Sequence, residues 1–220
     1  MQELHRGIPT NTDAKNELVA KTITNRLGQK SVTLSRIDDG KRFAGYPGLA
    51  GVASKIAKIV PDCFYYVEPF AGTAKVYQEL SISRFVKPVL NDKSTFICEW
   101  LKREMNLANV TSDDFAHCIQ KYDSKETVFV IDQPWFKQFY NQGFSYFDRK
   151  SVKEYDEQII NLCKTLKGKF IITTRKENTR MLNSGFNNYL VQSIYVICGK
   201  YPKTLVTTNI NIEDNDFIKI

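Results

Sequence analysis

The sequence lacks long hydrophobic runs, paired cysteines and histidine-rich segments. No apolar run among its 220 residues approaches the ~20 residues that span a bilayer, and the N-terminus has no hydrophobic segment of the signal-peptide type. Five cysteines stand singly without a C-x-x-C pair, and only two histidines are present. These absences argue against a disulfide framework and against a zinc or histidine-rich metal centre. We therefore expect a soluble, cytoplasmic protein that needs no metal.

Two common phosphate-binding motifs are also missing. Neither G-x-G-x-x-G nor G-x-x-x-x-G-K-[ST] occurs in the chain. The first motif holds a dinucleotide pyrophosphate and the second cradles the phosphates of a nucleoside triphosphate, so both classes of enzyme are disfavoured. Hydrophobic residues make up 42% of the sequence, which is enough to build the core of one domain with at most a small appendage.

The chain is basic, with 31 Lys and Arg against 24 Asp and Glu and a formal net charge of +7. A positive surface is what binding to a polyanion such as nucleic acid requires. The basic residues are spread along the whole chain, however, so a protein that is merely basic remains an alternative.

Residues 1–42 form a polar N-terminal arm in this interpretation. Asp13 is placed to cap a helix that runs to about Leu27 and ends at Gly28. The arm carries eight basic and five acidic residues, so it is either a nucleic-acid contact or a loosely packed extension.

Residues 43–220 alternate between strand and helix patterns. Strands are predicted at 63–67, 88–90, 126–131, 169–174, 189–198 and 204–209, and helices at 52–60, 95–107, 152–166 and 176–183. The last two strands are separated by Gly199-Lys200-Tyr201-Pro202, a hairpin-like spacing. The pattern predicts an α/β fold with a mostly parallel, doubly wound sheet and an antiparallel C-terminal hairpin.

Three predicted strands end in residues that suit ligand binding. The first runs into Glu68-Pro69-Phe70-Ala71-Gly72-Thr73, where Gly72 lets the backbone approach a ligand. The second ends at Asp92, which is suited to bind ribose hydroxyls. The third ends at Asp132-Gln133-Pro134-Trp135. There the carboxylate and the residue-133 carbonyl can accept both protons of an exocyclic amine, while the indole stacks on the base. Taken singly, each segment could be an ordinary turn, a surface acid or an aromatic lid.

In this order the segments resemble the alpha-group adenine-specific DNA methyltransferases, including short phage and prophage members. The resemblance runs from about Phe43 to Asn209 and implies a Rossmann-like methyltransferase fold with S-adenosylmethionine as cofactor. It implies that the cofactor is bound by Tyr46, Pro47, Gly48, Glu68, Pro69, Phe70, Gly72, Thr73, Asp92, Asp114 and Phe115. Asp132, Gln133, Pro134 and Trp135 stand where the family has its catalytic D-P-P-Y/W motif.

The sequence departs from the family in three places. Leu49-Ala50 stand where a small residue and a lysine follow the opening segment, and Lys55 is a candidate substitute for that lysine. Gln133 replaces the first proline of the catalytic motif, which removes its fixed φ. The interval from Gly72 to Asp132 leaves no room for a target-recognition domain.

The resemblance implies adenine-specific DNA methylation with base flipping, as in restriction–modification systems. The alternatives are an RNA adenine methyltransferase and a catalytically silent methyltransferase-like binding subunit. DNA is the expected nucleic-acid partner, a second subunit for target recognition is a further candidate partner, and no membrane partner is expected. Aromatic and basic residues interleave after the catalytic segment, which suits contact with an unpaired base and its backbone. The candidates for this contact are Lys137, Phe144, Tyr146, Arg149 and Lys150.

Overall fold

The computed structural model describes residues 17–24, 30–38, 41–44, 51–105, 109–133, 152–194 and 202–220. The chain forms two compact units, residues 1–48 and 49–220. We describe each unit by itself.

The first unit contains a three-stranded antiparallel sheet in the order β1-β2-β3. Its strands are β1 (Glu17–Thr24), β2 (Lys30–Asp38) and β3 (Lys41–Ala44). Thr24 pairs with Lys30 at one end of β1, and Glu17 pairs with Ile37 at the other. The predicted helix from Asp13 to Leu27 is therefore wrong. Val19, Thr22 and Ile23 are β-branched residues that favour a strand, and pairing with β2 satisfies their backbone groups.

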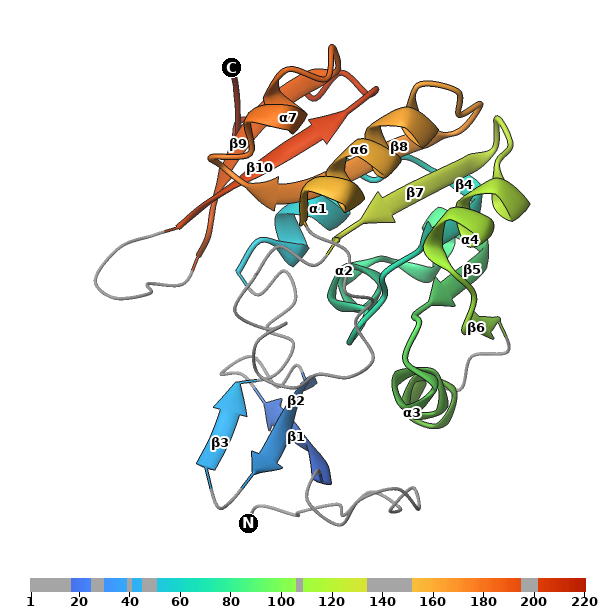
Figure 1. The fold of residues 1–220 in the computed structure, drawn as a ribbon, viewed down its shortest axis with the longest axis vertical. Helices are drawn as coiled ribbons and strands as arrows, with labels where there is room; N and C mark the ends of the chain where they lie inside the picture. The colour runs from blue at the N-terminus through green and yellow to red at the C-terminus, as the bar shows by residue number, and fades with distance from the viewer. Residues whose placement is uncertain are drawn as a thin grey trace. The chain divides into compact units, whose positions relative to one another are not determined.

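The second unit is built on an eight-stranded sheet in the order β11-β9-β10-β8-β7-β4-β5-β6 (Figure 1). The strands β6, β5, β4, β7 and β8 run parallel to one another. Their bounds are β4 Cys63–Glu68, β5 Phe85–Asn91, β6 Val110–Thr111, β7 Thr127–Ile131 and β8 Lys169–Arg175. The remaining strands are β9 Asn187–Gln192, β10 Lys203–Thr208 and β11 Phe217–Lys219.

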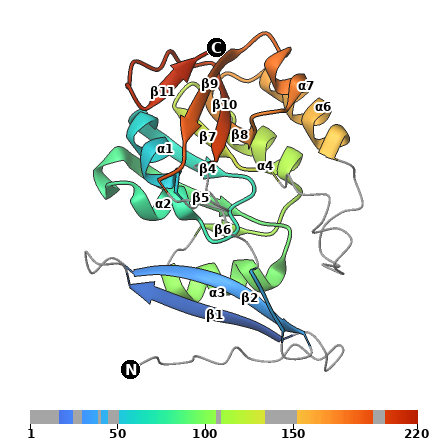
Figure 2. The same ribbon diagram turned by 90° about the vertical axis from the view of Figure 1, so that its left-hand side faces the viewer.

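Helices cover both faces of this sheet. They are α1 Ala53–Ile59, α2 Lys75–Glu79, α3 Thr95–Met105, α4 Phe115–Tyr122, α6 Val152–Cys163 and α7 Thr179–Leu182, with a 3-10 turn η1 at Ile82–Arg84. In Figure 2, α1 and α2 lie on one side of the sheet and α6 and α7 on the other. Successive residues of a strand point to opposite faces. Accordingly Val67, Phe129 and Ile131 join the cluster that packs with Phe115, Ile159 and Met181 from α4, α6 and α7.

The sheet confirms the predicted doubly wound α/β class and its C-terminal hairpin. β10 pairs antiparallel with β9, and it also pairs antiparallel with β8, so it is inserted between them. The sequence patterns did not predict α4, β6 or β11, which are short or depend on pairing with distant strands.

Two negative findings concern the described ranges. Within them, no helix is long and apolar enough to cross a membrane, and no group of three or more His, Cys, Asp or Glu side chains is arranged to hold a metal ion. The cysteines that lie in these ranges are free thiols: Cys63, Cys98, Cys118 and Cys163.

Candidate functional site

The three predicted strand ends meet at one edge of the sheet. β4 lies between β5 and β7, with Glu68 beside Leu90 of β5 and Val67 beside Phe129 of β7. All three strands are parallel, so the residues that follow them lie together at their carboxyl ends. Ligands of open α/β sheets bind at this edge.

The loop after β4 turns back tightly onto the end of β5. Gly72 and Ala74 both have a φ of 50°, in the left-handed region, where a non-glycine residue is strained. Ala71 N–H donates to the Asn91 carbonyl over 2.8 Å, and Gly72 N–H donates to Asp92 Oδ2 over 3.0 Å. The loop is thus held against the strand end that carries the predicted ribose-binding acid, and α2 begins directly after it.

Asp92 keeps acceptor capacity for a ligand. Its Oδ2 accepts from Gly72 N–H, and its Oδ1 accepts from Ser94 N–H over 2.9 Å. A carboxylate has about four lone-pair sites, so each oxygen can accept one further hydrogen bond. Burial raises the pKa of Asp92 to about 6, while the two backbone donors lower it. At neutral pH the group is mainly ionised and suited to accept from a pair of hydroxyls.

Asn91 organises this edge, a role that the sequence analysis did not assign. Its fully buried side chain donates from Nδ2 to the carbonyls of Pro69 and Asp113, both over 3.0 Å. Its Oδ1 accepts from Thr111 Oγ1 over 2.7 Å and from Asp113 N–H over 2.9 Å. One amide therefore joins the end of β5 to the segment that follows β4 and to the end of β6. A polar residue at the end of an otherwise apolar strand was the available signal.

Glu68 is directed into the protein and not toward open solvent. Its Oε1 accepts from Tyr66 Oη over 2.5 Å and from Tyr77 N–H in α2 over 2.9 Å, and the residue is 5% exposed. Burial raises the pKa of Glu68 to about 8; the two hydrogen bonds lower it, and the charge of nearby Asp132 raises it further. Through its hydrogen bond with Tyr77 N–H, the side chain ties the end of β4 to α2, the helix that follows the loop containing Gly72.

Thr73 contributes a buried hydroxyl to the same loop. The residue is 2% exposed, and its Oγ1 has no hydrogen-bond partner within the described part of the chain. A buried polar group without a partner costs free energy, and such a group at a candidate site is available to a ligand.

Asp114 and Phe115 have structural contacts. Asp114 caps α4, where its Oδ1 accepts from Ala116 N–H over 2.9 Å. The Phe115 ring is 4% exposed and stacks on Phe70, with the ring centroids 4.8 Å apart. Tyr155 of α6 packs against both rings. Phe70 is only partly buried, so the aromatic group extends from the core to the candidate site.

Asp132 lies at the end of β7, next to the strand that carries Glu68. Its Oδ1 accepts from Thr173 Oγ1 of β8 over 2.8 Å, and the residue stays partly exposed. Gln133 is 1% exposed, and its Nε2 donates to Asp156 Oδ1 of α6. The sequence analysis missed Thr173 and Asp156, because only the pairing of β7 with β8 and the packing of α6 bring them to this edge.

Several predicted site residues lie outside the described ranges: Tyr46, Pro47, Gly48, Pro134, Trp135, Lys137, Phe144, Tyr146, Arg149 and Lys150. Lys55 lies inside them, in α1. Its Nζ pairs with Asp216 Oδ1 over 3.0 Å, so this ammonium already has a partner in the C-terminal segment.

Comparison with known proteins shows the fold and no closer relationship. The sequence matches no protein-family model and no curated protein. Solved structures are similar at low identity. Spermidine synthase from Thermotoga maritima is 15% identical with a TM-score of 0.50, over 98% of this chain and 77% of that one. A spermidine synthase in complex with the transition-state analogue AdoDATO is 16% identical with a TM-score of 0.51, over 98% and 78%.

A third similar structure is SMU.776, a protein with a proposed methyltransferase activity, solved in complex with SAH. It is 12% identical with a TM-score of 0.51, and the match covers 91% of this chain and 58% of that one. The mostly parallel sheet with its antiparallel C-terminal strands is therefore a Rossmann-like fold of the kind found in these proteins.

Proposed function

We propose that this protein is an S-adenosylmethionine-dependent methyltransferase that acts on the exocyclic amine of adenine in DNA. The observation that carries this proposal is the meeting of two different carboxylates at one sheet edge. Asp92 is bonded to the Gly72 loop, and Asp132 ends the neighbouring β7. The first is suited to hold a cofactor, and the second is suited to orient the amine.

The residues around Gly72 fit the cofactor. Asp92 would accept the ribose hydroxyls with its remaining lone pairs, and the unpartnered Thr73 hydroxyl would bond to a polar group beside the loop. The SMU.776 structure, which contains SAH, supports this class of ligand. When bound, S-adenosylmethionine supplies an activated methyl group, whose carbon bonds to the amine nitrogen as its bond to the sulfonium breaks to leave a thioether.

Asp132 and the carbonyl of residue 133 would act on the amine itself. Each accepts one N–H, so the nitrogen lone pair is directed away from both acceptors and toward the methyl group. The negative charge of Asp132 also stabilises the positive charge that develops on the nitrogen. The amine then releases one proton to the Asp132 carboxylate or to water. Alignment of this kind supplies roughly 7–11 kcal/mol in well-oriented reactions.

A catalytically silent binding subunit is the second candidate. One observation favours it: Lys55 pairs with Asp216, so it does not replace the lysine that is missing beside Leu49-Ala50. Binding of S-adenosylmethionine, measured by calorimetry, separates the two candidates at the first step, because this subunit would bind none.

A methyl-transfer assay tests the proposed function. The wild-type protein is incubated with labelled S-adenosylmethionine and either unmethylated DNA or RNA, and the products are digested and analysed by mass spectrometry. We expect N6-methyladenine in DNA and its loss in Asp132→Ala. Methylation of RNA alone would establish the RNA alternative, and undiminished transfer by Asp132→Ala would refute the assigned role of Asp132.

A further inference from the structure

Gln133 links the end of β7 to two helices. Its Nε2 donates to Asp156 Oδ1 in α6, and Asn178 Nδ2 donates to the same oxygen over 3.0 Å. Asn178 also caps α7, where its Oδ1 accepts from Met181 N–H over 3.2 Å. The Oδ1 atom of Asp156 in α6 therefore binds both Gln133, the residue that follows Asp132 after β7, and Asn178 at the start of α7. We call Gln133, Asp156 and Asn178 the amide clasp.

Stability alone does not account for this clasp. Asp156 is 3% exposed, and burying a carboxylate costs more than burying an apolar side chain of the same size. Burial raises the pKa of Asp156, and the hydrogen bonds from Gln133 and Asn178 lower it. Gln133 Oε1 is buried and has no hydrogen-bond partner among the described residues. A buried polar network that is only partly hydrogen-bonded stabilises the folded protein less than apolar side chains in the same place would.

The clasp has the geometry of a positioning device. Ile131 is the last residue of β7 and pairs with Ile172 of β8, so the backbone is fixed just before Asp132. The Gln133 side chain is fixed at its tip by Asp156. The two restraints lie on either side of the Asp132–Gln133 peptide, and together they hold the Gln133 Cα from which its own carbonyl projects.

We propose that Gln133 is a positioning residue: through Asp156 it fixes the direction of its own carbonyl and of Asp132 toward the amine. Proline at this place locks φ through its ring, whereas glutamine leaves φ free. The amide clasp supplies the missing restraint from the side chain. This inference rests on the proposed function, because it assigns the direction of the two groups that accept the amine protons.

The first test is a double-mutant cycle at Gln133 and Asp156. Gln133→Glu faces Asp156 with a second carboxylate, and we expect kcat to fall about tenfold or more. In Gln133→Glu with Asp156→Asn, the new amide donates to the new carboxylate, so we expect most of the lost kcat to return. Glu157→Gln, on the neighbouring exposed position of α6, is the matched control and keeps the wild-type kcat.

The second test separates positioning from structural support. Gln133→Ala removes the clasp, while Gln133→Pro removes it and restores the fixed φ. We expect kcat to fall about tenfold in the alanine variant and to recover in the proline variant. The affinity for SAH, measured by calorimetry, stays within about threefold of wild type in both variants.

Three outcomes overturn the inference. The first is an active Gln133→Ala with unchanged kcat, and the second is a proline variant no better than alanine. The third is a loss of kcat that is fully accounted for by unfolding or by weaker SAH binding. An inactive wild-type protein would instead overturn the proposed function, and this inference with it.

Discussion

The two ends of the parallel strands contain the same residue types in different surroundings. At the carboxyl ends, Glu68 is 5% exposed, and burial raises the pKa values of Glu68 and Asp92 above their usual range. At the amino ends, the acids precede their strands in exposed or partly exposed turns. Asp62 precedes β4 and its side chain is 81% exposed, and Asp123 precedes β7. Among the described residues, Glu68 and Asp92 are therefore desolvated carboxylates at the carboxyl ends of the strands, whereas Asp62 and Asp123 are not buried.

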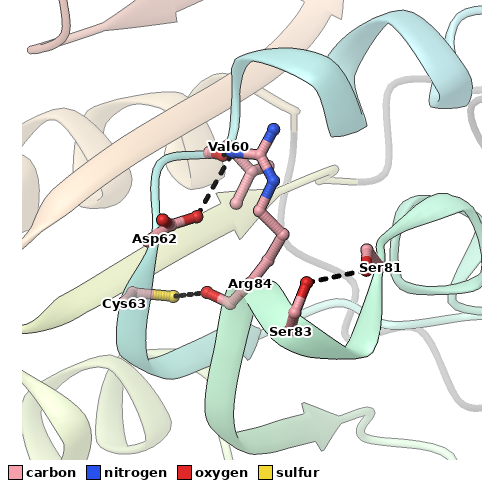
Figure 3. Close-up of polar contacts among 6 residues, drawn as sticks. All are labelled: Val60, Asp62, Cys63, Ser81, Ser83 and Arg84. Carbon is pink, nitrogen blue, oxygen red and sulfur yellow. Dashed lines mark hydrogen bonds and ion pairs between the residues drawn. The ribbon is translucent and has the colours of Figure 1, made fainter.

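Figure 3 shows the amino end of β4 and β5. Arg84 Nη1 donates to the Val60 carbonyl over 3.0 Å and pairs with Asp62 Oδ1 over 3.4 Å. The Cys63 thiol donates to the Arg84 carbonyl over 3.9 Å. These contacts join α1, β4 and η1 through groups that solvent partly reaches. They hold the segments that connect these elements in place, so we assign them a role in the stability of the fold.

Asp123 performs the same structural task before β7. Its Oδ1 accepts from the backbone N–H groups of Lys167 and Gly168, both over 3.0 Å, which fixes the turn into β8. Asp132, at the other end of β7, accepts from the side chain of Thr173, and its charge raises the pKa of Glu68. The difference between the two ends of one strand supports the proposed ligand site, and each prediction below tests it.

The largest effect is expected from the two aspartates of β7. Asp132→Ala removes the carboxylate that aligns the amine and stabilises its developing charge, so methyl transfer should fall by about 10³-fold. Asp123→Ala is the matched control from the amino end. It should lower the free energy of unfolding by about 1 kcal/mol and leave kcat unchanged. Equal losses of kcat in the two variants would contradict the assignment of function to the carboxyl ends of the strands and of stability to the amino ends.

Glu68 makes stability depend on pH. Its pKa is about 8 in the folded protein against a usual value of 4.5, so the folded state keeps a proton that the unfolded state has released. The contribution of this group is fully present below pH 4.5 and is lost as the pH rises toward 8. Glu68→Gln should remove a decline on the order of 5 kcal/mol across this range. Denaturant unfolding at pH 5 and pH 9 measures it, and parallel pH profiles for both proteins would contradict the assignment.

Gly168 lies directly before β8, at the sheet edge formed by the amino ends of the parallel strands, which we call the amino edge. A substitution there tests this edge through backbone contacts. A Cβ at this position would lie 2.9 Å from the carbonyl oxygens of Ser124 and Thr127 and 3.2 Å from the Phe129 ring. Gly168→Ala should therefore lower the free energy of unfolding by about 2 kcal/mol. SAH affinity in the folded protein should not change, and a large change measured by calorimetry would show that the two edges are not independent.

Arg84 should give the smallest effect. Its ion pair with Asp62 is open to solvent, and such pairs contribute about 1 kcal/mol or less. Thermal or denaturant unfolding of Arg84→Ala should show a loss of this size, with methyl transfer unaffected. A change in methyl transfer would assign a functional role to the amino edge.

The sequence predicted which strand ends form the candidate site, because each strand is a short apolar run followed by a polar residue. Glu68, Asp92 and Asp132 were found in this way, and the parallel order of β5, β4 and β7 brings them to one edge. Asn91 was missed as an organiser, because its four hydrogen bonds reach two segments, at Pro69 and at 111–113, that are far from it in the sequence.

Distant pairing and burial explain the remaining differences. The apolar residues around Leu18 and Ile23 fit a helix locally, but pairing with β2 selects a strand. Asp114 and Phe115 fit the resembled motif, and the sequence did not show that the acid also caps α4 or that the ring packs against Phe70 and Tyr155. Such contacts depend on the packed fold, and no local pattern specifies them.

Calorimetry with SAH is the most direct test of the carboxyl edge as a cofactor site, because it needs no knowledge of the methyl acceptor. Asp92→Ala removes two acceptor positions for ribose hydroxyls, each worth about 1.4 kcal/mol, so affinity should fall about 100-fold. Asp62→Ala, at the amino end of β4, should bind SAH as the wild-type protein does. A wild-type protein that binds no SAH, or an Asp92→Ala variant that binds it equally well, would contradict the account.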